Sequence, residues 1–422
     1  MISLSRLNAS WKVLGPGLVF AGAAVGVSHL VQSTRAGASY GFGLIWVLII
    51  ANMLKYPFME FGPRYANVTG KSLIDGYKII GNWALILYLI FTFGTMFAIQ
   101  AAVTIVTAGI FASVFNLTLS PVLISAFILF VSMIILGFGR YSTLDKIIKV
   151  VIVTLALSTI IAVILALKLD FFDHETVSGH FNWSNHLDVL FLIAFVGWMP
   201  APIDVSVWHS LWSVAKEDQM GRRPTLHQTL TDFNIGYIGA ALLGVGFLLL
   251  GALVMFGTGE ELSSNGAMFS RQLISMYTAS IGSWAYPLIA VAALTTMFST
   301  VITCLDAYPR VLRKSTELLF RQKLPMEKYS QLLYWIWIMV VVTGTITLLG
   351  YLSGTMRFMV DLATTISFVT APVLAVINFK VITHKHIPDF ARPKPWLRVY
   401  AWLGIIFLSV FSVVFIVWQF IL

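Results

Sequence analysis

Long runs of apolar residues separated by short polar segments extend along most of the chain. With a window of about 19 residues, eleven segments are long enough to cross a hydrocarbon core of roughly 30 Å. The predicted spans are residues 14–36, 42–66, 83–114, 120–138, 145–168, 187–212, 229–257, 282–312, 332–353, 357–379 and 399–421. The pattern predicts an all-α integral membrane protein with eleven transmembrane helices.

The first span is interrupted near its middle. Gly26 and Val27 are followed by the polar residues Ser28 and His29, at a depth where lipid demands a closed backbone. Unwound backbone is tolerated there only where it is buried in protein or lines a cavity. We therefore predict a broken first helix with a transport site beside it.

The sixth span is interrupted in a similar way between Gly197 and Asp204. Pro200 and Pro202 remove backbone donors in the middle of the span and stop a continuous helix. Two broken spans in corresponding positions of two halves indicate an inverted-repeat transporter with its site near the bilayer midplane. A pair of ordinary kinked helices is the alternative interpretation.

This interpretation divides a single transmembrane domain, residues 1–422, into two repeats and an extra helix. Repeat one covers about 14–168, repeat two about 187–380, and the extra helix about 399–421. The candidate substrate-binding residues at the two breaks are Gly26, Ser28, His29, Ala201, Pro202, Ile203 and Asp204.

Composition and charge support the membrane class and add an orientation. Hydrophobic residues make up 58% of the chain and charged residues 11%, with a mean hydropathy of +0.88. Most of the 27 Lys and Arg residues fall in alternate loops, which places the N-terminus in the cytoplasm and the C-terminus outside. This topology accounts for the net charge of +9 without nucleic acid as a partner. The single cysteine, Cys304, is predicted to be a packed thiol and excludes a cysteine metal cluster.

Charged residues inside spans are functional hypotheses by default. Three pairs have the i,i+4 spacing of ion pairs on one helix face: Glu60 with Arg64, Asp306 with Arg310, and Arg357 with Asp361. Lys55 and Asp204 have no oppositely charged residue at such a spacing. Because an unpaired buried charge is costly, we predict that Lys55 pairs with Asp204 or reaches into the site. There its fixed ammonium would stand where other transporters place a coupling cation, or would attract an anionic substrate.

Motifs in the first two spans resemble the Nramp family of divalent-metal transporters. The matching residues are Gly15-Pro16-Gly17, Ala36-Gly37, Gly41, Trp46-Val47, Ala51-Asn52, Arg64 and Val68-Thr69-Gly70-Lys71, with Gly197, Pro202, His209, Ser210 and Leu211 in the sixth span. The resemblance implies a LeuT-like fold, a 5+5 inverted repeat with broken helices 1 and 6 and one added helix, that works by alternating access.

The chain departs from that family where the family binds its metal. The Asp-Pro-Gly-Asn motif of the family is replaced by Gly26-Val27-Ser28-His29, and its Met-Pro-His motif by Ala201-Pro202-Ile203. His29 and Asp204 remain as candidate metal ligands, since imidazole and carboxylate both bind divalent cations. Spans 83–114 and 332–353 contain no ionisable residue apart from tyrosines.

These observations predict a multi-pass protein of the plasma membrane that is not an enzyme and carries no cofactor. We expect a secondary active transporter that resembles Nramp divalent metal ion transporters but has an altered substrate site. The alternative is a LeuT-fold carrier of a small polar or anionic solute that does not depend on metal; a non-transporting sensor is a third. Its partners are the lipid bilayer and the transported ion or solute.

Overall fold

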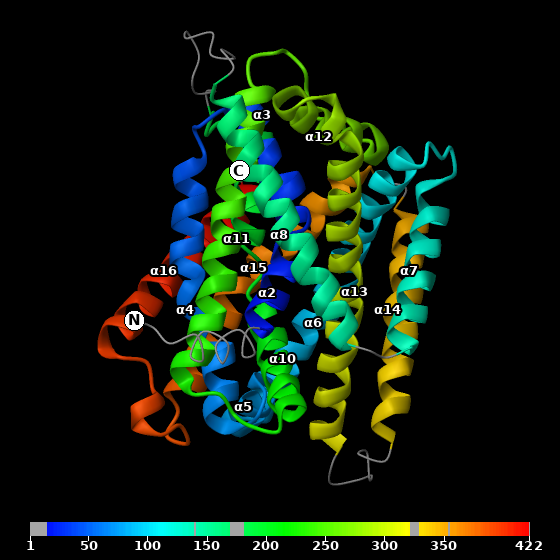
Figure 1. Cartoon of the computed structure of the whole chain (residues 1–422). Helices are drawn as coiled ribbons and strands as arrows, with labels where there is room; N and C mark the ends of the chain where they lie inside the picture. The colour runs from blue at the N-terminus through cyan, green and yellow to red at the C-terminus, as the bar shows by residue number, and fades with distance from the viewer. Residues whose placement is uncertain (1–14, 139–140, 169–180, 321–328, 353–354, 422) are drawn as a thin grey trace, which may run out of the picture.

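The computed structural model describes residues 15–138, 141–168, 181–320, 329–352 and 355–421. In this part of the chain the regular secondary structure is helical, and the long helices run between two ends of one bundle (Figure 1). The elements are α2 (Pro16–Ala24), η1 (Ser28–Ser33), α3 (Thr34–Tyr40), α4 (Ile45–Thr69), α5 (Leu73–Ile80), α6 (Asn82–Val114), α7 (Pro121–Gly137), α8 (Tyr141–Ala166), α9 (His186–Trp198), α10 (Val205–Met220), α11 (Leu226–Val254), α12 (Gly266–Ile281), η2 (Ser283–Ala285), α13 (Tyr286–Phe320), α14 (Ser330–Tyr351), α15 (Met356–Thr383), η4 (Asp389–Ala391) and α16 (Pro395–Ile421).

The membrane-spanning character of the bundle follows from helix length and apolar composition. Among the described residues, six helical segments are long and apolar enough to cross a bilayer: those of α6, α11, α13, α14, α15 and α16. The bent pair Pro16–Ala24 and Ser28–Tyr40, with an angle of 47°, makes a seventh. The other four predicted spans are also helical, as α4, α7, α8 and the pair α9 and α10. The count of eleven spans remains a prediction.

The boundaries of several elements differ from those expected. The predicted sixth span is two helices, and α10 continues to Met220, beyond the predicted end at residue 212. Two short helices lie in predicted loops: α5 near the lower end of the bundle in Figure 1 and α12 near the upper end. The apolar pattern did not predict these two helices, because each is too short to cross a bilayer. Residues 169–180, between the predicted spans 145–168 and 187–212, lie outside the described residues.

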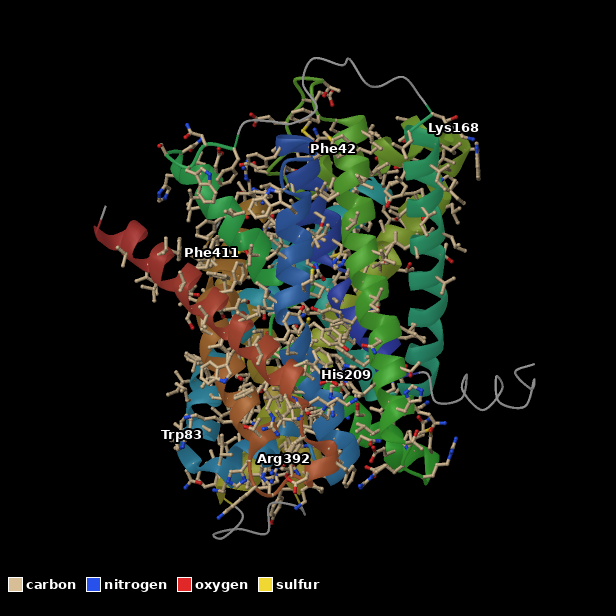
Figure 2. All side chains as sticks on the ribbon, turned by 90° about the vertical axis from the view of Figure 1, so that its left-hand side faces the viewer. Phe42, Trp83, Lys168, His209, Arg392 and Phe411 are labelled. Carbon is tan, nitrogen blue, oxygen red and sulfur yellow. The ribbon has the colours of Figure 1, made fainter. Side chains whose placement is uncertain are left out.

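The outside of the bundle is apolar. Large hydrophobic side chains such as Ile90, Phe127, Leu242 and Trp402 are exposed on its surface, as expected where lipid is the surrounding medium. Charged residues gather instead at the ends, and Figure 2 shows Lys168 at one end and Arg392 at the other.

The interrupted helices lie in the interior. α2 packs against α10, α11 and α13, while α3 packs against α11. α9 packs against α15, and α10 against α4. Figure 1 shows α2 surrounded by these longer helices near mid-height, so both breaks are screened from the lipid.

Candidate functional site

The first break separates α2 from the π-helical turn η1. α2 ends at Ala24, and regular helix resumes at Ser28. A Cβ atom at Gly26 would lie 2.7 Å from the Thr300 side-chain oxygen in α13, closer than real Cβ contacts come. Glycine is therefore required for the close approach of the break to α13. Thr300 Oγ1 lies 3.3 Å from the Gly22 carbonyl and 3.1 Å from the Thr296 carbonyl of its own helix, so the two acceptors share its single proton.

The second break separates α9 from α10 at residues Met199 to Asp204. Its unwound end is held by Lys55 of α4, which is 1% exposed. Lys55 Nζ donates to the carbonyls of Val196 and Gly197 at 2.6 and 2.7 Å, and to that of Ala201 at 3.4 Å. The ammonium thus lies at the carbonyl end of a half-helix, where the macrodipole favours positive charge.

His29 is buried and both of its ring nitrogens have partners. Nδ1 is 2.7 Å from the hydroxyl of Ser28, and Nε2 is 2.8 Å from the carbonyl oxygen of Ala240 in α11. A carbonyl accepts only, so Nε2 carries a proton in this arrangement. His29 therefore contacts α11 through Nε2, which is protonated, while Nδ1 shares the single proton of the Ser28 hydroxyl with the Ala24 carbonyl, 2.6 Å from that hydroxyl.

A pocket lies between the two breaks, and we call it the central pocket. It is lined by Ala23, Ala24, Val27, Ser28, Ile99, Val103, Trp198, Ala201, Pro202, Val205, Trp208, Thr300 and Cys304. Three predicted site residues, Ser28, Ala201 and Pro202, are among them. Most lining side chains are apolar, and the exceptions carry a hydroxyl, a thiol or an indole. A pocket with such a lining suits a small organic group, which makes apolar contacts with it, and offers few ligands to a bare divalent cation.

Asp204 lines a second, smaller pocket on the other side of the sixth-span break. This Asp204 pocket is formed by Tyr88, Phe91, Thr92, Thr95, Pro202, Ile203, Asp204, Ser367, Thr370 and Leu374, from α6, the break and α15. Asp204 is 7% exposed, and its Oδ1 has no hydrogen-bond partner within the described ranges. The two candidate metal ligands thus face different elements: His29 faces α11, and Asp204 faces α6 and α15. No group of three His, Cys, Asp or Glu side chains suited to a metal occurs in the described part of the chain.

The upper end of the site is crossed by an ion pair between α3 and α15. Arg35 Nη1 donates to Asp361 Oδ1 at 2.8 Å and to Gln32 Oε1 at 3.1 Å, and the guanidinium lies 4.8 Å from the ring centre of Phe191. The predicted i,i+4 partner Arg357 is 4.0 Å from Asp361. Arg35 is thus the nearer partner, and we call this contact the upper latch.

The lower end is crossed by a contact between α2 and α11. The backbone N–H groups of Gly15 and Gly17 donate to the Asp232 carboxylate at 3.0 and 2.7 Å. A carboxylate at a helix N-terminus is favoured by the free N–H groups and by the macrodipole. We call this contact the lower latch. His209 of α10, labelled in Figure 2, lies in the same half, with its ring stacked 5.6 Å from that of Phe20.

All three predicted i,i+4 ion pairs are present, the one between Arg357 and Asp361 at 4.0 Å. Arg64 Nε donates to Glu60 Oε1 at 3.1 Å, and Arg310 Nε to Asp306 Oδ2 at 2.6 Å. The residues of α6 and α15 that line the two pockets were not predicted from the sequence. Thr92 and Thr95 lie one helical turn apart in a span without acidic or basic residues, and this spacing indicates a polar face. Spacing alone does not show which residues pack against that face.

Comparisons with known proteins agree with this architecture. A family model described as "Natural resistance-associated macrophage protein-like" (Nramp) matches residues 17–418. The chain is 34% identical over 421 residues to Uncharacterized protein PM0681 of Pasteurella multocida, covering 99% of this chain and 95% of the relative. It is 32% identical to the "Divalent metal cation transporter MntH" of Mycobacterium tuberculosis over 85 residues, 20% of each chain.

A solved structure shares the fold. The crystal structure of a mutant of the Eremococcus coleocola manganese transporter superposes with a TM-score of 0.65 at 16% identity, covering 99% of this chain and 89% of that one. The match of the family model over nearly the whole chain, together with the apolar helices, identifies the class of protein. The chain belongs to the Nramp family of multi-pass membrane transporters.

Proposed function

We propose that the chain is a secondary active transporter that works by alternating access, with its substrate in the central pocket. The observation that carries this proposal is the position of that pocket between two broken helices, with a latch on either side. The lining residues Ser28, Trp198, Trp208 and Thr300 are each at most 4% exposed, so the pocket is closed at both ends. Opening one latch at a time exposes it to one side of the membrane.

The proposed architecture is the LeuT-like one of eleven membrane helices. α2 with α3 and α4 through α8 form repeat one, α9 with α10 and α11 through α15 form repeat two, and α16 is the extra helix. The end of the bundle that carries Arg392 (Figure 2) faces the cytoplasm under the positive-inside rule, which places the start of α2 inside and the end of α16 outside. The plasma membrane is the proposed location, and no enzymatic activity is proposed.

The pocket walls support a small organic solute as the substrate, with a site altered from that of metal carriers. Both nitrogens of His29 are engaged, and Asp204 opens into the other pocket. The central pocket offers the hydroxyls of Ser28 and Thr300 to a polar group and broad apolar walls to the rest of a molecule. Both hydroxyls donate their protons to backbone carbonyls, so their oxygens accept hydrogen bonds from the solute and fix its orientation, while apolar contact supplies most of the affinity.

A divalent metal ion is the second candidate substrate. It is supported by the family and by the name of the MntH relative, a divalent metal cation transporter. Ser28, the thiol of Cys304 and the Ala201 carbonyl are the groups of the central pocket that could contribute ligands. We regard His29 and Asp204 as ligands only if one of them moves during transport.

Cys304 tests the proposal directly, because it is the single cysteine of the chain and lines the central pocket. In proteoliposomes, we expect a water-soluble maleimide to label Cys304 whether it is added to one side of the membrane or to the other. Labelling should be slow, because the thiol reacts only while the pocket is open to the side that contains the reagent. Cys304→Ser, which must abolish labelling, is the control. Labelling from one side only, under all conditions, would contradict alternating access.

The same assay separates the two substrate classes. Manganese chloride and small amino or carboxylic acids are added in turn, and the labelling rate is measured. Protection by an organic solute that persists with a chelator present supports the first candidate. Protection by micromolar manganese that the chelator removes supports the second.

A further inference from the structure

The Asp204 pocket is separate from the central pocket and contains chemistry that the proposed transport of a substrate does not use. Its only acidic side chain is Asp204. Lys55, the charged neighbour expected to pair with it, donates instead to the carbonyls of Val196, Gly197 and Ala201. Asp204 Oδ1 therefore lies buried, without a hydrogen-bond partner among the described residues.

The threonine and serine hydroxyls of this pocket act as acceptors toward its interior. Thr92 donates its hydroxyl proton to the Tyr88 carbonyl at 2.9 Å, and Thr95 to that of Phe91 at 2.9 Å. Ser367 donates to the Ala363 carbonyl at 2.7 Å. A hydroxyl has one proton, so each of these oxygens can offer only lone pairs to anything in the pocket.

Thr370 on α15 follows the same rule. Its hydroxyl lies 3.1 Å from the Ser367 carbonyl and 3.2 Å from that of Ile366. The hydroxyl oxygen of Tyr88 is buried and without a hydrogen-bond partner in the described ranges. The pocket thus brings together one carboxylate and several neutral oxygens from α6, α15 and the break, an arrangement that suits a hard cation and repels an anion.

The charge of the site selects the valence of that cation. One monovalent ion neutralises the single carboxylate of the pocket lining, and a divalent ion would leave a net positive charge buried there. The absence of a sulfur or imidazole ligand among the lining residues also disfavours the softer transition metals.

We propose that the Asp204 pocket binds a monovalent alkali cation such as Na⁺ through the Asp204 carboxylate and the hydroxyl oxygens of α6 and α15. The bound ion bridges the broken sixth span to two continuous helices. It stabilises the closed arrangement of the break, because a ligand that binds one state stabilises that state. The proposal concerns ion binding and holds whichever substrate occupies the central pocket.

The test is thermal unfolding of the purified full chain in detergent, in NaCl, KCl or choline chloride at equal ionic strength. We expect the melting temperature to rise and to saturate with Na⁺ relative to choline. Asp204→Asn should abolish this rise, measured against its own baseline in choline. Thr95→Val removes one oxygen ligand and keeps the carboxylate. It should raise the half-saturating Na⁺ concentration about tenfold, the effect of about 1.4 kcal/mol.

Thr343→Val is the matched control. Thr343 also donates its hydroxyl to its own helix, at 2.6 Å from the Met339 carbonyl, but it lies on α14 and is exposed. The melting temperature of Thr343→Val should depend on Na⁺ in the same way as that of the unmodified chain.

Several results would overturn the proposal. They are equal melting in Na⁺, K⁺ and choline, a Na⁺ effect that survives Asp204→Asn, stabilisation through Asp204 by manganese alone, or a dependence on pH without one on alkali cations, which would assign the site to a proton. Because the assay involves no transport, a failure of the proposed transport function leaves its result unchanged.

Discussion

Under the proposed orientation and alternating-access cycle, removing the upper latch should open the central pocket toward the outer face more often. Arg35 is 6% exposed, and its bond to Asp361 at 2.8 Å connects α3 to α15. At an effective dielectric constant of about 20, two unit charges at that separation attract by roughly 6 kcal/mol. The Asp361 side chain is 36% exposed, so water screens the attraction between the two charges. Water also solvates both charges when the contact opens, which offsets much of this energy. We expect a net contribution of about 1–2 kcal/mol.

Arg35→Ala should therefore shift the equilibrium between closed and outward-open forms by a factor of about 5–30. The assay is the rate at which a membrane-impermeant maleimide labels Cys304 from the outer face of proteoliposomes. The labelling rate is proportional to the fraction of molecules in the outward-open form when opening is fast relative to labelling. Asp361→Asn should produce a similar increase, and the double variant should add little to either, because both substitutions remove the same contact.

Arg357→Ala is the matched control for this experiment. Arg357 is on the same helix as Asp361 and has the same charge as Arg35, but its nitrogen is 4.0 Å from the carboxylate and its side chain is 45% exposed. A change of less than about twofold is expected, as for exposed ion pairs. Equal labelling of Arg35→Ala and the unmodified chain, or an equal increase in Arg357→Ala, would refute the reasoning.

Three further predictions concern the lower latch, the sixth-span break and the loop that follows α15. Asp232→Asn weakens the acceptor at the start of α2, and it should raise labelling of Cys304 from the inner face about fivefold, the effect of about 1 kcal/mol. Lys55→Met removes the donor to the end of α9 and should lower the stability measured by denaturation by about 2–3 kcal/mol, whereas the exposed Lys71→Met should have little effect. Burial and neighbouring positive charges lower the pKa of His386 from its ordinary value of 6.5. The unfolded chain thus binds a proton more readily, and stability falls as pH decreases below about 6.5. His386→Gln should reduce that loss by less than about 1 kcal/mol, as measured in thermal melts at two pH values.

Local patterns predicted the membrane class and the two broken helices. Residues 15–37 combine an apolar run with glycine and polar residues, and Pro200 and Pro202 cannot continue a helix. These are consequences of backbone geometry within one segment. The structure ends α2 at Ala24 and α9 at Trp198, next to the predicted positions.

The chemistry of the site was less predictable, because helical spacing identifies a face and not the residues opposite it. Asp361 has Arg357 at i−4, yet its nearer partner is Arg35, far away in the sequence. Lys55 was expected to meet Asp204 or a substrate, and its hydrogen bonds go to backbone carbonyls at the end of α9, which no side-chain pattern reveals.

The sequence by itself determined that this chain crosses a membrane and where its first and sixth spans break, since both follow from local hydrophobicity and from glycine and proline geometry. Only the tertiary structure decided what surrounds those breaks. It placed His29 against α11, directed Asp204 to hydroxyls of α6 and α15, and lined the central pocket with apolar side chains. These contacts join residues far apart in the chain, and they depend on how whole helices pack.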